Sequence, residues 1–138
     1  WRGSLGAPAR SLLLSGGMIS SEEIGRTVAL RARLTAAADR ALAMCDAVVT
    51  PSMGTVALPV EVGAGIMASP VPHFTRFASL TGQPSITIPS GRSANGLPFG
   101  VLLNGARGED RKLLHLATLV EGVLARAAEA ARGTEGAT

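Results

Sequence analysis

Few residues of this chain are of the types that perform catalysis, and their spacing does not assemble them into a familiar catalytic group. Ser52 follows Thr50-Pro51 and lies just beyond the end of a predicted strand, a position where α/β proteins often place their sites. A serine nucleophile needs a base beside it, yet no G-x-S-x-G sequence surrounds Ser52. His73 and His115 lie far apart in the sequence. We therefore expect Ser52 to be a turn residue, His115 to be a satisfied or exposed helix residue and His73 to lie at the surface or line a pocket, and we assign no catalytic residue.

The remaining reactive side chains are one lysine and one cysteine. Lys112 falls in the first turn of a predicted helix, on its charged side, where a solvated lysine is expected. Cys45 has no second cysteine to pair with, and its place at the apolar end of a predicted helix predicts a buried, inert thiol. Two histidines and one cysteine at no ligand spacing predict no metal site. The sequence has no glycine-rich phosphate motif, so we expect no cofactor.

Apolar residues dominate the composition. Hydrophobic residues make up 46% of the 138 residues, and charged residues only 17%. A domain of this size has much surface to keep hydrated, so the imbalance indicates a core piece of a larger domain or a surface for an obligate partner. No apolar run approaches the roughly 18 residues that a membrane span needs. A lone cysteine suits a reducing compartment, and we expect a cytoplasmic protein.

The positive charge is dispersed along the chain. The formal net charge is +3, and the arginines are spread out instead of clustered. Aromatic residues make up only 3% of the chain. Nucleic-acid binding favours a basic stripe, often with aromatic residues that stack on bases. We therefore expect solvated arginines, and neither a nucleic-acid nor a membrane partner.

Hydrophobic periodicity and turn residues predict the order of helices and strands. Ser20 and Glu23 have the spacing of a capping box at a helix start. Thr75 is the expected cap of a short helix that Gly82 ends. The expected elements are an irregular lead-in at 1–19, helices at 20–45, 74–81 and 109–128, strands at 47–50, 85–89 and 99–104, a long loop at 51–73, and a frayed tail at 129–138.

The three predicted strands are apolar on both faces, which predicts cover on both sides of the sheet. The strands at 85–89 and 99–104 are expected to pair antiparallel, since Asn95-Gly96 gives the backbone freedom for the turn region between them. The predicted fold class is α/β: part of a mixed β-sheet flanked by helices, within a single domain.

The order of short motifs resembles one family. The motifs are Asp46-Ala47-Val48-Val49-Thr50-Pro51, Leu80-Thr81-Gly82-Gln83-Pro84-Ser85, Pro89-Ser90-Gly91, Gly96-Leu97-Pro98-Phe99-Gly100 and Gly105. In this order they are similar to the C-terminal part of the amidase signature hydrolases, where LTGxP and GLPxG segments precede a helix that opens with acidic residues. The resemblance covers roughly residues 20–125.

The resemblance implies hydrolysis of a carboxamide C–N bond through an acyl-enzyme on a serine, activated by a serine-lysine relay. In the family these residues lie in an upstream Gly/Ser-rich segment, of which this sequence shows no counterpart. We therefore expect residues 1–138 to be the C-terminal fragment of a single amidase-type domain, partnered by the missing N-terminal part. The loop at 51–73 corresponds to the mouth of the family's substrate channel or is a simple connector. Met53, His73 and Phe77 are the residues expected to bind the small amide substrate.

Alternatives to this function stay open. One is the A subunit of the aminoacyl-tRNA amidotransferase, which has the same C-terminal pattern and works in a partner complex. Another is a non-catalytic, stand-alone binding or structural module derived from the amidase fold. A homo-oligomer of this chain is open as well.

We predict that the reading frame continues upstream into a Gly/Ser-rich segment that carries a lysine and two serines. The reason is that the family motifs are present while the family's catalytic residues are not. Sequencing the coding region upstream of the codon for Trp1 tests this. A natural start codon beside that codon, with no such segment in frame, would favour the stand-alone module.

Overall fold

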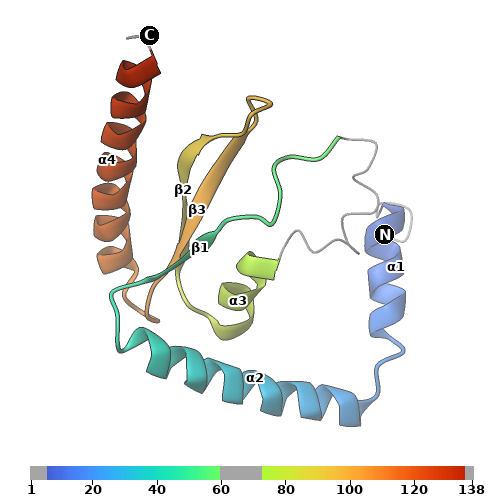
Figure 1. The fold of residues 1–138 in the computed structure, drawn as a ribbon. Helices are drawn as coiled ribbons and strands as arrows, with labels where there is room; N and C mark the ends of the chain where they lie inside the picture. Colours follow the sequence, from blue (N-terminus) through green and yellow to red (C-terminus); the bar gives the residue numbers. More distant parts are fainter. Residues whose placement is uncertain (1–5, 60–72, 136–138) are drawn as a thin grey trace. The chain divides into compact units, whose positions relative to one another are not determined.

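The computed structural model describes residues 6–59 and 73–135. The elements in chain order are α1 (Ala7–Gly16), α2 (Ser21–Leu42), β1 (Val48–Pro51), α3 (His73–Thr81), β2 (Ser85–Arg92), β3 (Pro98–Asn104) and α4 (Asp110–Glu135) (Figure 1). The predicted α/β class is confirmed. Residues up to Leu34 and residues from Thr35 onward form two separate compact units, and the second holds the sheet.

Helix α1 forms where the sequence predicted an irregular lead-in, so that prediction was wrong. The glycine and proline residues that suggested irregularity lie at the ends of the helix. Gly6 and Gly17 are its caps, and a proline lies in its first turn. Proline is tolerated there because a first-turn N–H has no partner within the helix. The alanines and leucines between the ends favour a helix.

The capping box predicted at the start of α2 is confirmed. The Ser20 hydroxyl accepts a hydrogen bond from the Glu23 N–H at 3.2 Å, and the Glu23 carboxylate accepts one from the Ser20 N–H at 2.9 Å. The bond from the Ser20 backbone is the main reason that the pKa of Glu23 is lowered. Because α2 already ends at Leu42, Cys45 lies beyond the helix and is exposed. The prediction of a buried thiol was therefore wrong.

The apolar face predicted for the first long helix is mostly uncovered among the described residues. Every residue from 6 to 34 whose burial is described is exposed. Ile24 is 53% exposed and Val28 63% exposed. The buried residues of α2 are Ala38 and Leu42, both in the second unit. The spacing thus predicted the helix correctly, but most of its apolar stripe contacts no core here.

Strand β3 is the centre of an antiparallel sheet with the order β1-β3-β2. Asn104 at the end of β3 is paired with Val48 on one side and with Ser85 on the other. The antiparallel pairing predicted for β2 and β3 is confirmed, and Gly96 in the connecting turn has a φ of +76°. The strand bounds differ from the predicted ones by one to three residues.

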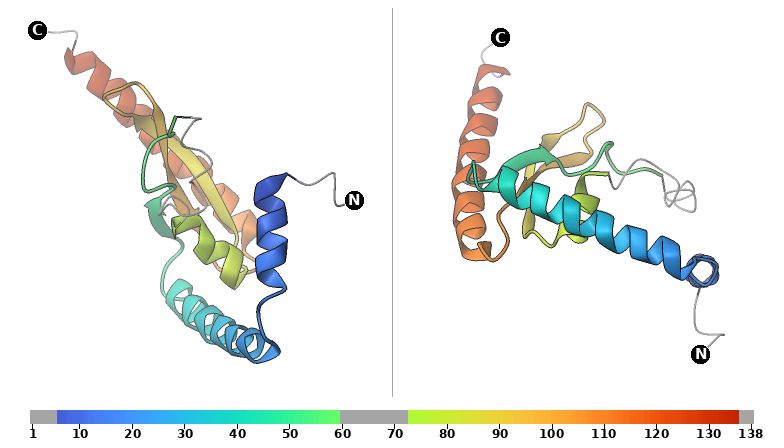
Figure 2. Two further views of the ribbon diagram at one scale, coloured as in Figure 1. Left: turned by 90° about the vertical axis from the view of Figure 1, so that its right-hand side faces the viewer. Right: turned by 90° about the horizontal axis from the view of Figure 1, so that it is seen from below.

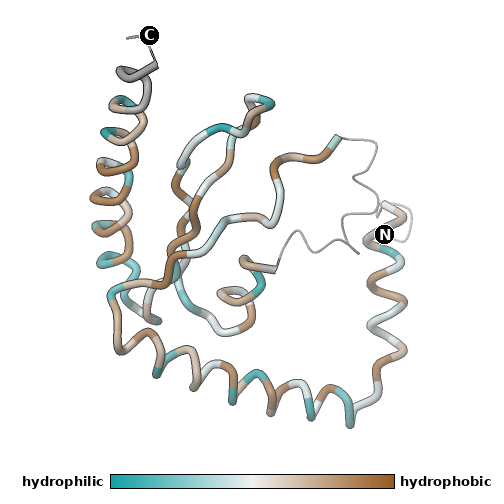
Figure 3. Tube along the Cα trace, in the orientation of Figure 1, coloured by the Kyte–Doolittle hydropathy of each residue, from teal (hydrophilic) through white to brown (hydrophobic). Residues whose placement is uncertain are grey.

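Helix α4 packs against the sheet and closes the core. Ile88 and Leu103 from the strands contact Leu113 and Ala117 from α4, and all four are at most 5% exposed. Figure 3 shows the apolar residues of the strands gathered where they pass beside α4. The helix continues to Glu135 in an alanine-rich stretch, which favours helix. The tail predicted to fray from residue 129 is therefore helical as far as residue 135.

Helix α3 lies on the other side of the sheet from α4 (Figures 1 and 2) and contacts β3. It begins at His73, so Thr75 is inside the helix and its predicted role as the cap was wrong. It ends at Thr81 as predicted, and Gly82 follows in the left-handed region with a φ of +80°.

The prediction of cover on both faces holds only for the end of β3. Leu102, Leu103 and Asn104 are buried, although neighbouring side chains on a strand point to opposite faces. By contrast, Val49 on β1 is 58% exposed and Phe99 at the start of β3 is 47% exposed. The sheet therefore has a buried end and an exposed end.

An ion pair connects the last turns of α2 with the segment between β3 and α4. The Arg107 Nε–H donates to Asp39 Oδ1 at 2.9 Å, and a second guanidinium nitrogen donates to Oδ2. Gln83 Nε2 donates to Asp39 Oδ1 at 3.2 Å. The hydrogen bonds from Arg107 are the main reason that the pKa of Asp39 is lowered. The folded second unit therefore favours the charged form of this carboxylate.

Gly100 on β3 lies close to β2 and to Ser52, the residue after β1. A Cβ at this position would lie 2.7 Å from the Ile88 carbonyl oxygen, 3.0 Å from Thr87 Cγ2 and 3.2 Å from Ser52 Oγ. The nearest of these atoms belongs to the backbone of β2, which cannot move without disturbing the ladder. A side chain at residue 100 is therefore incompatible with the observed spacing of the strands.

We predict that Gly100→Ala destabilises the protein by about 1–3 kcal/mol, because the added methyl group overpacks the sheet. Gly25→Ala is the matched control, since nothing lies within 4 Å of a Cβ at this helical glycine. That control should stabilise by roughly 0.5–1 kcal/mol. Urea denaturation of the longest protein that the reading frame encodes measures both changes. Equal midpoints for Gly100→Ala and the unchanged protein would contradict the close approach.

We also predict that residues 1–138, expressed alone, self-associate, aggregate or remain loosely packed. The exposed apolar residues occur in both units, among them Leu14 at 69%, Val28 at 63% and Leu114 at 59%. An apolar patch of a few hundred Å² that stays exposed to water loses several kcal/mol of burial free energy, at about 25 cal/mol per Å². This loss is comparable to the free energy of unfolding of a small domain. Light scattering and calorimetry at micromolar concentration test this. A monomer with one sharp thermal transition is the contrary result.

Candidate functional site

A cavity of about 620 Å³ lies where β1 ends, beside the exposed end of the β2–β3 pair. One part of its lining is the segment that follows β1, and the other part comes from β2 and β3. The lining residues are Pro51, Ser52, Met53, Gly54, Thr55, Val56, Ala57, Thr87, Pro89, Pro98, Phe99 and Gly100. Its volume is in the range of small-molecule sites, roughly 300–1,000 Å³.

The described lining of the cavity is largely apolar and uncharged. None of the described residues that line it carries an ionisable side chain. Met53 and Phe99 are its large apolar residues that remain half exposed, at 45% and 47%. A lining of this kind suits a neutral group, since an ion placed there would find no opposite charge among these residues.

Ser52 is fixed where the strand gives way to the cavity lining. Its N–H donates to the Gly100 carbonyl oxygen at 3.0 Å, which extends the pairing of β1 with β3 by one bond. The residue is only 8% exposed, and its Oγ has no hydrogen-bond partner among the described residues. No described base therefore forms a hydrogen bond with this hydroxyl, and the expectation that Ser52 is a turn residue without a catalytic role stays a prediction.

Phe99 is held against the backbone of β2. It is paired with Gly91, next to an irregularity in the register between Pro89 and Gly91. A Cβ at Gly91 would lie 3.0 Å from Phe99 Cζ and 3.4 Å from Phe99 Cε1. The glycine thus leaves the space that the phenylalanine ring occupies, a cross-strand arrangement in which an aromatic ring covers a glycine.

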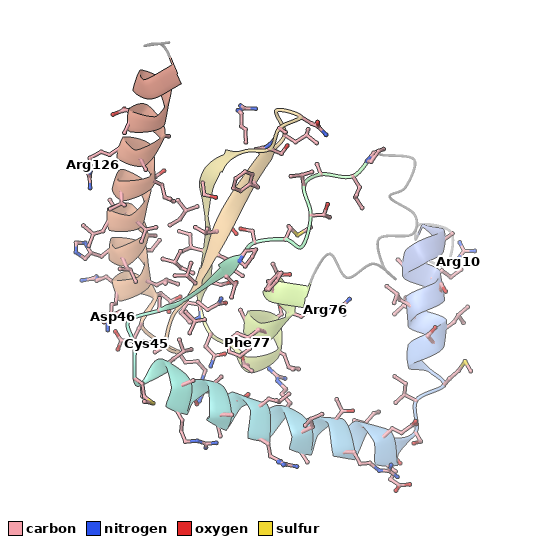
Figure 4. All side chains as sticks on the ribbon, viewed as in Figure 1. Arg10, Cys45, Asp46, Arg76, Phe77 and Arg126 are labelled. Carbon is pink, nitrogen blue, oxygen red and sulfur yellow. The ribbon has the colours of Figure 1, made fainter. Side chains whose placement is uncertain are left out.

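The three residues predicted to bind a substrate have different positions. Met53 lines the cavity. Phe77 lies on α3, is 39% exposed, and does not belong to the cavity lining (Figure 4). His73 is the first residue of α3, but its side chain lies outside the described part of the structure. A substrate-binding role stays a prediction for all three.

No sequence pattern pointed to the cavity residues on the strands. Thr87, Pro89 and Phe99 lie far in sequence from the segment after β1, yet they share its cavity. The signal that relates them is the register, in which Val101 is opposite both Pro51 and Ile88. Motif spacing alone does not contain that register, because residues 60–72 and α3 separate the strands.

The other candidate residues lie away from the cavity. His115 is exposed on α4, as expected. Lys112 is half exposed and pairs with Asp46 at 2.8 Å, and hydrogen bonding to that carboxylate is the main reason that its pKa is raised. Among the described residues, no three His, Cys, Asp or Glu side chains gather to hold a metal ion. No helix in the described ranges is long and apolar enough to cross a membrane.

Comparison with known protein sequences gives partial but consistent matches. The chain is 36% identical over 81 residues to the A subunit of glutamyl-tRNA(Gln) amidotransferase from Nitrobacter hamburgensis, covering 55% of this chain and 16% of that protein. It is 32% identical over 109 residues to the protein of the same name from Chlamydia trachomatis, covering 75% and 22%. It is 46% identical over 48 residues to a lipoamidase of Enterococcus faecalis, covering 35% and 7%.

Solved structures share the fold. The crystal structure of an amidase matches with a TM-score of 0.75 and 25% identity over 88% of this chain and 29% of that one. The crystal structure of the A subunit of glutamyl-tRNA(Gln) amidotransferase from Thermotoga maritima matches with a TM-score of 0.66 and 24% identity over 83% and 27%. This chain therefore spans less than a third of each structure that it resembles.

The family assignment is based on a match longer than any single motif. The model of the Amidase family matches residues 9–114, which include α2, the three strands and α3. The fold match to a solved amidase covers the same architecture of helices and antiparallel strands. The chain therefore belongs to the amidase signature family.

Proposed function

We propose that this chain is the C-terminal part of an amidase that hydrolyses carboxamide C–N bonds, with the catalytic serines and lysine supplied by a preceding N-terminal part of the same domain. The observation that carries the proposal is the family match over residues 9–114 together with a neutral cavity at the end of β1. A neutral cavity of this size suits the uncharged substituent of an amide.

The role of this chain in such an enzyme is to position and enclose the substrate. Strand β3 fixes the end of β1 and the start of the cavity lining through the bond from Ser52 to Gly100. Met53 and Phe99 offer apolar surface to a bound molecule. The described residues bring no base to Ser52, and in the proposed enzyme the nucleophile belongs to the preceding N-terminal part.

A second candidate is the A subunit of an aminoacyl-tRNA amidotransferase. The observation in its favour is that several relatives with 32–37% identity are, by name, A subunits of glutamyl-tRNA(Gln) amidotransferases. Such a protein would act in a complex. The two candidates differ in whether amide hydrolysis by the longest product of the reading frame needs partner proteins.

We predict that the isolated chain hydrolyses no amide above background, whereas the longest product of the reading frame does. The physical reason is that this chain brings no nucleophile–base pair together in its described part. A panel of aliphatic and aryl amides, assayed by ammonia release, measures both activities. Ser52→Ala is assayed in parallel and should leave hydrolysis by the longest product within severalfold of the unchanged protein.

Two results would overturn the proposal. Turnover by the isolated chain that disappears in Ser52→Ala would reveal a catalytic site in this chain. Absence of amide hydrolysis by the longest product, alone and with co-purified partners, would exclude both an amidase and an amidotransferase component. Activity that appears only with co-purified partners and a glutamyl-tRNA would select the second candidate.

A further inference from the structure

We propose that the cavity is a subsite for an uncharged aryl or alkyl substituent of the amide, and that Phe99, positioned by Gly91, supplies the ring against which an aryl substituent packs. This inference rests on the proposed function for the identity of the ligand as an amide. The site itself is drawn from the cavity lining and from the contact between β2 and β3.

The uncharged, mostly apolar lining of the cavity indicates which chemical groups it can bind. The described lining residues offer apolar surface from Met53, Val56 and Phe99, and hydroxyl groups from serine and threonine, but no ionisable group. A carboxylate or ammonium group would lose its hydration there without gaining a partner of opposite charge. An aryl group would keep favourable contacts, since aromatic rings pack well edge-to-face or offset against another ring.

Phe99 is the residue of the lining whose position is most closely controlled by a neighbour. The Phe99 ring lies over Gly91, where an added Cβ would come within 3.0 Å of Cζ. Any side chain at residue 91 would therefore push the ring by a few tenths of an ångström. Because the ring is 47% exposed and lines the cavity, such a shift alters the room for a ligand without removing core contacts.

Gly91 is thus a positioning residue, which acts on the ligand only through Phe99. The effects of substitutions at Gly91 and Phe99 should therefore depend on each other. Replacing Gly91 should affect binding only while the phenylalanine ring is present. In a double variant without the ring, the effect of the change at Gly91 should disappear, which is the non-additivity expected of residues in contact.

The experiment is a binding titration of the longest product of the reading frame, followed by the ¹³C-methyl signal of Met53. The probes are acetamide, the larger neutral amide 4-phenylbutyramide, and 4-(4-carboxyphenyl)butyramide, an anionic counterpart that carries its charge on the substituent. A Met53→Leu variant assigns the signal. Met44 is 89% exposed and lies outside the cavity lining, so its methyl signal is the internal reference.

We expect 4-phenylbutyramide to shift the Met53 signal saturably and 4-(4-carboxyphenyl)butyramide to bind at least tenfold more weakly. Phe99→Ala should raise the Kd of 4-phenylbutyramide about three- to tenfold, the equivalent of the extra stabilisation of an aromatic pair, and should leave the Kd of acetamide within twofold. Gly91→Ala should raise the Kd of 4-phenylbutyramide about threefold. Combined with Phe99→Ala, it should add nothing further.

The controls separate a local effect from a general loss of structure. Leu119→Ala replaces an exposed apolar residue on α4, outside the cavity lining, and should change no Kd. Phe99→Leu keeps an apolar wall and provides the test if Phe99→Ala does not fold. Equal weakening of acetamide and 4-phenylbutyramide, tighter binding of the anion, or an undiminished effect of Gly91→Ala in the double variant would each overturn the inference.

The outcome is independent of the proposed function, because the Met53 signal reports binding and not turnover. If the probes bind as described but no amide is hydrolysed, the subsite stands and the proposed function fails. If amides are hydrolysed while the variants at Phe99 and Gly91 leave all Kd values unchanged, the proposed function stands and this inference fails.

Discussion

The sheet depends on the pairing of its central strand β3 with both neighbouring strands around Gly100. At Gly100, β3 has the Ile88 carbonyl of β2 on one side and the end of β1 on the other, where Ser52 bonds to its carbonyl oxygen. A strand paired on both edges fixes its neighbours relative to each other, because the hydrogen bonds set both distance and register. The cavity and the core are both consequences of that pairing.

One end of β3 belongs to the buried core and the other end lines the cavity. Toward its C-terminus, Leu103 is fully buried against α4, and Asn104 is paired with both neighbouring strands. Toward its N-terminus, Phe99 and Gly100 are part of the cavity lining. The packed end supplies rigidity to the exposed end, so the cavity residues are held by a strand and not by a loop alone. Sites built on strands keep their geometry better than sites built on loops.

Sequence patterns predicted the features that depend on local physics. The capping box of Ser20 and Glu23, the helix end at Gly82 and the antiparallel pairing of β2 with β3 follow from neighbouring residues and were confirmed. Helix α1 was missed because Gly6 and Gly17 cap the helix and its proline lies in the first turn, so none of these residues interrupts it. The prediction that Cys45 is buried was wrong because α2 ends at Leu42, and the exposure of the residues after a helix depends on tertiary packing. The cavity could not be predicted from the sequence, because the residues that line it are brought together by the register of the strands.

Several residues of the motifs shared with the family are glycines that the backbone conformation or close packing requires. Gly82 and Gly96 have positive φ values, and a side chain at Gly100 or Gly105 would collide with Ile88 or crowd Leu113. None of these four glycines can donate a proton or attack a carbonyl through a side chain. The motif therefore reports how the sheet and its turns are built, and it bears on function only through the fold that positions a site. All of these constraints lie within residues 35–138, so the motif describes how the unit that contains the sheet is built.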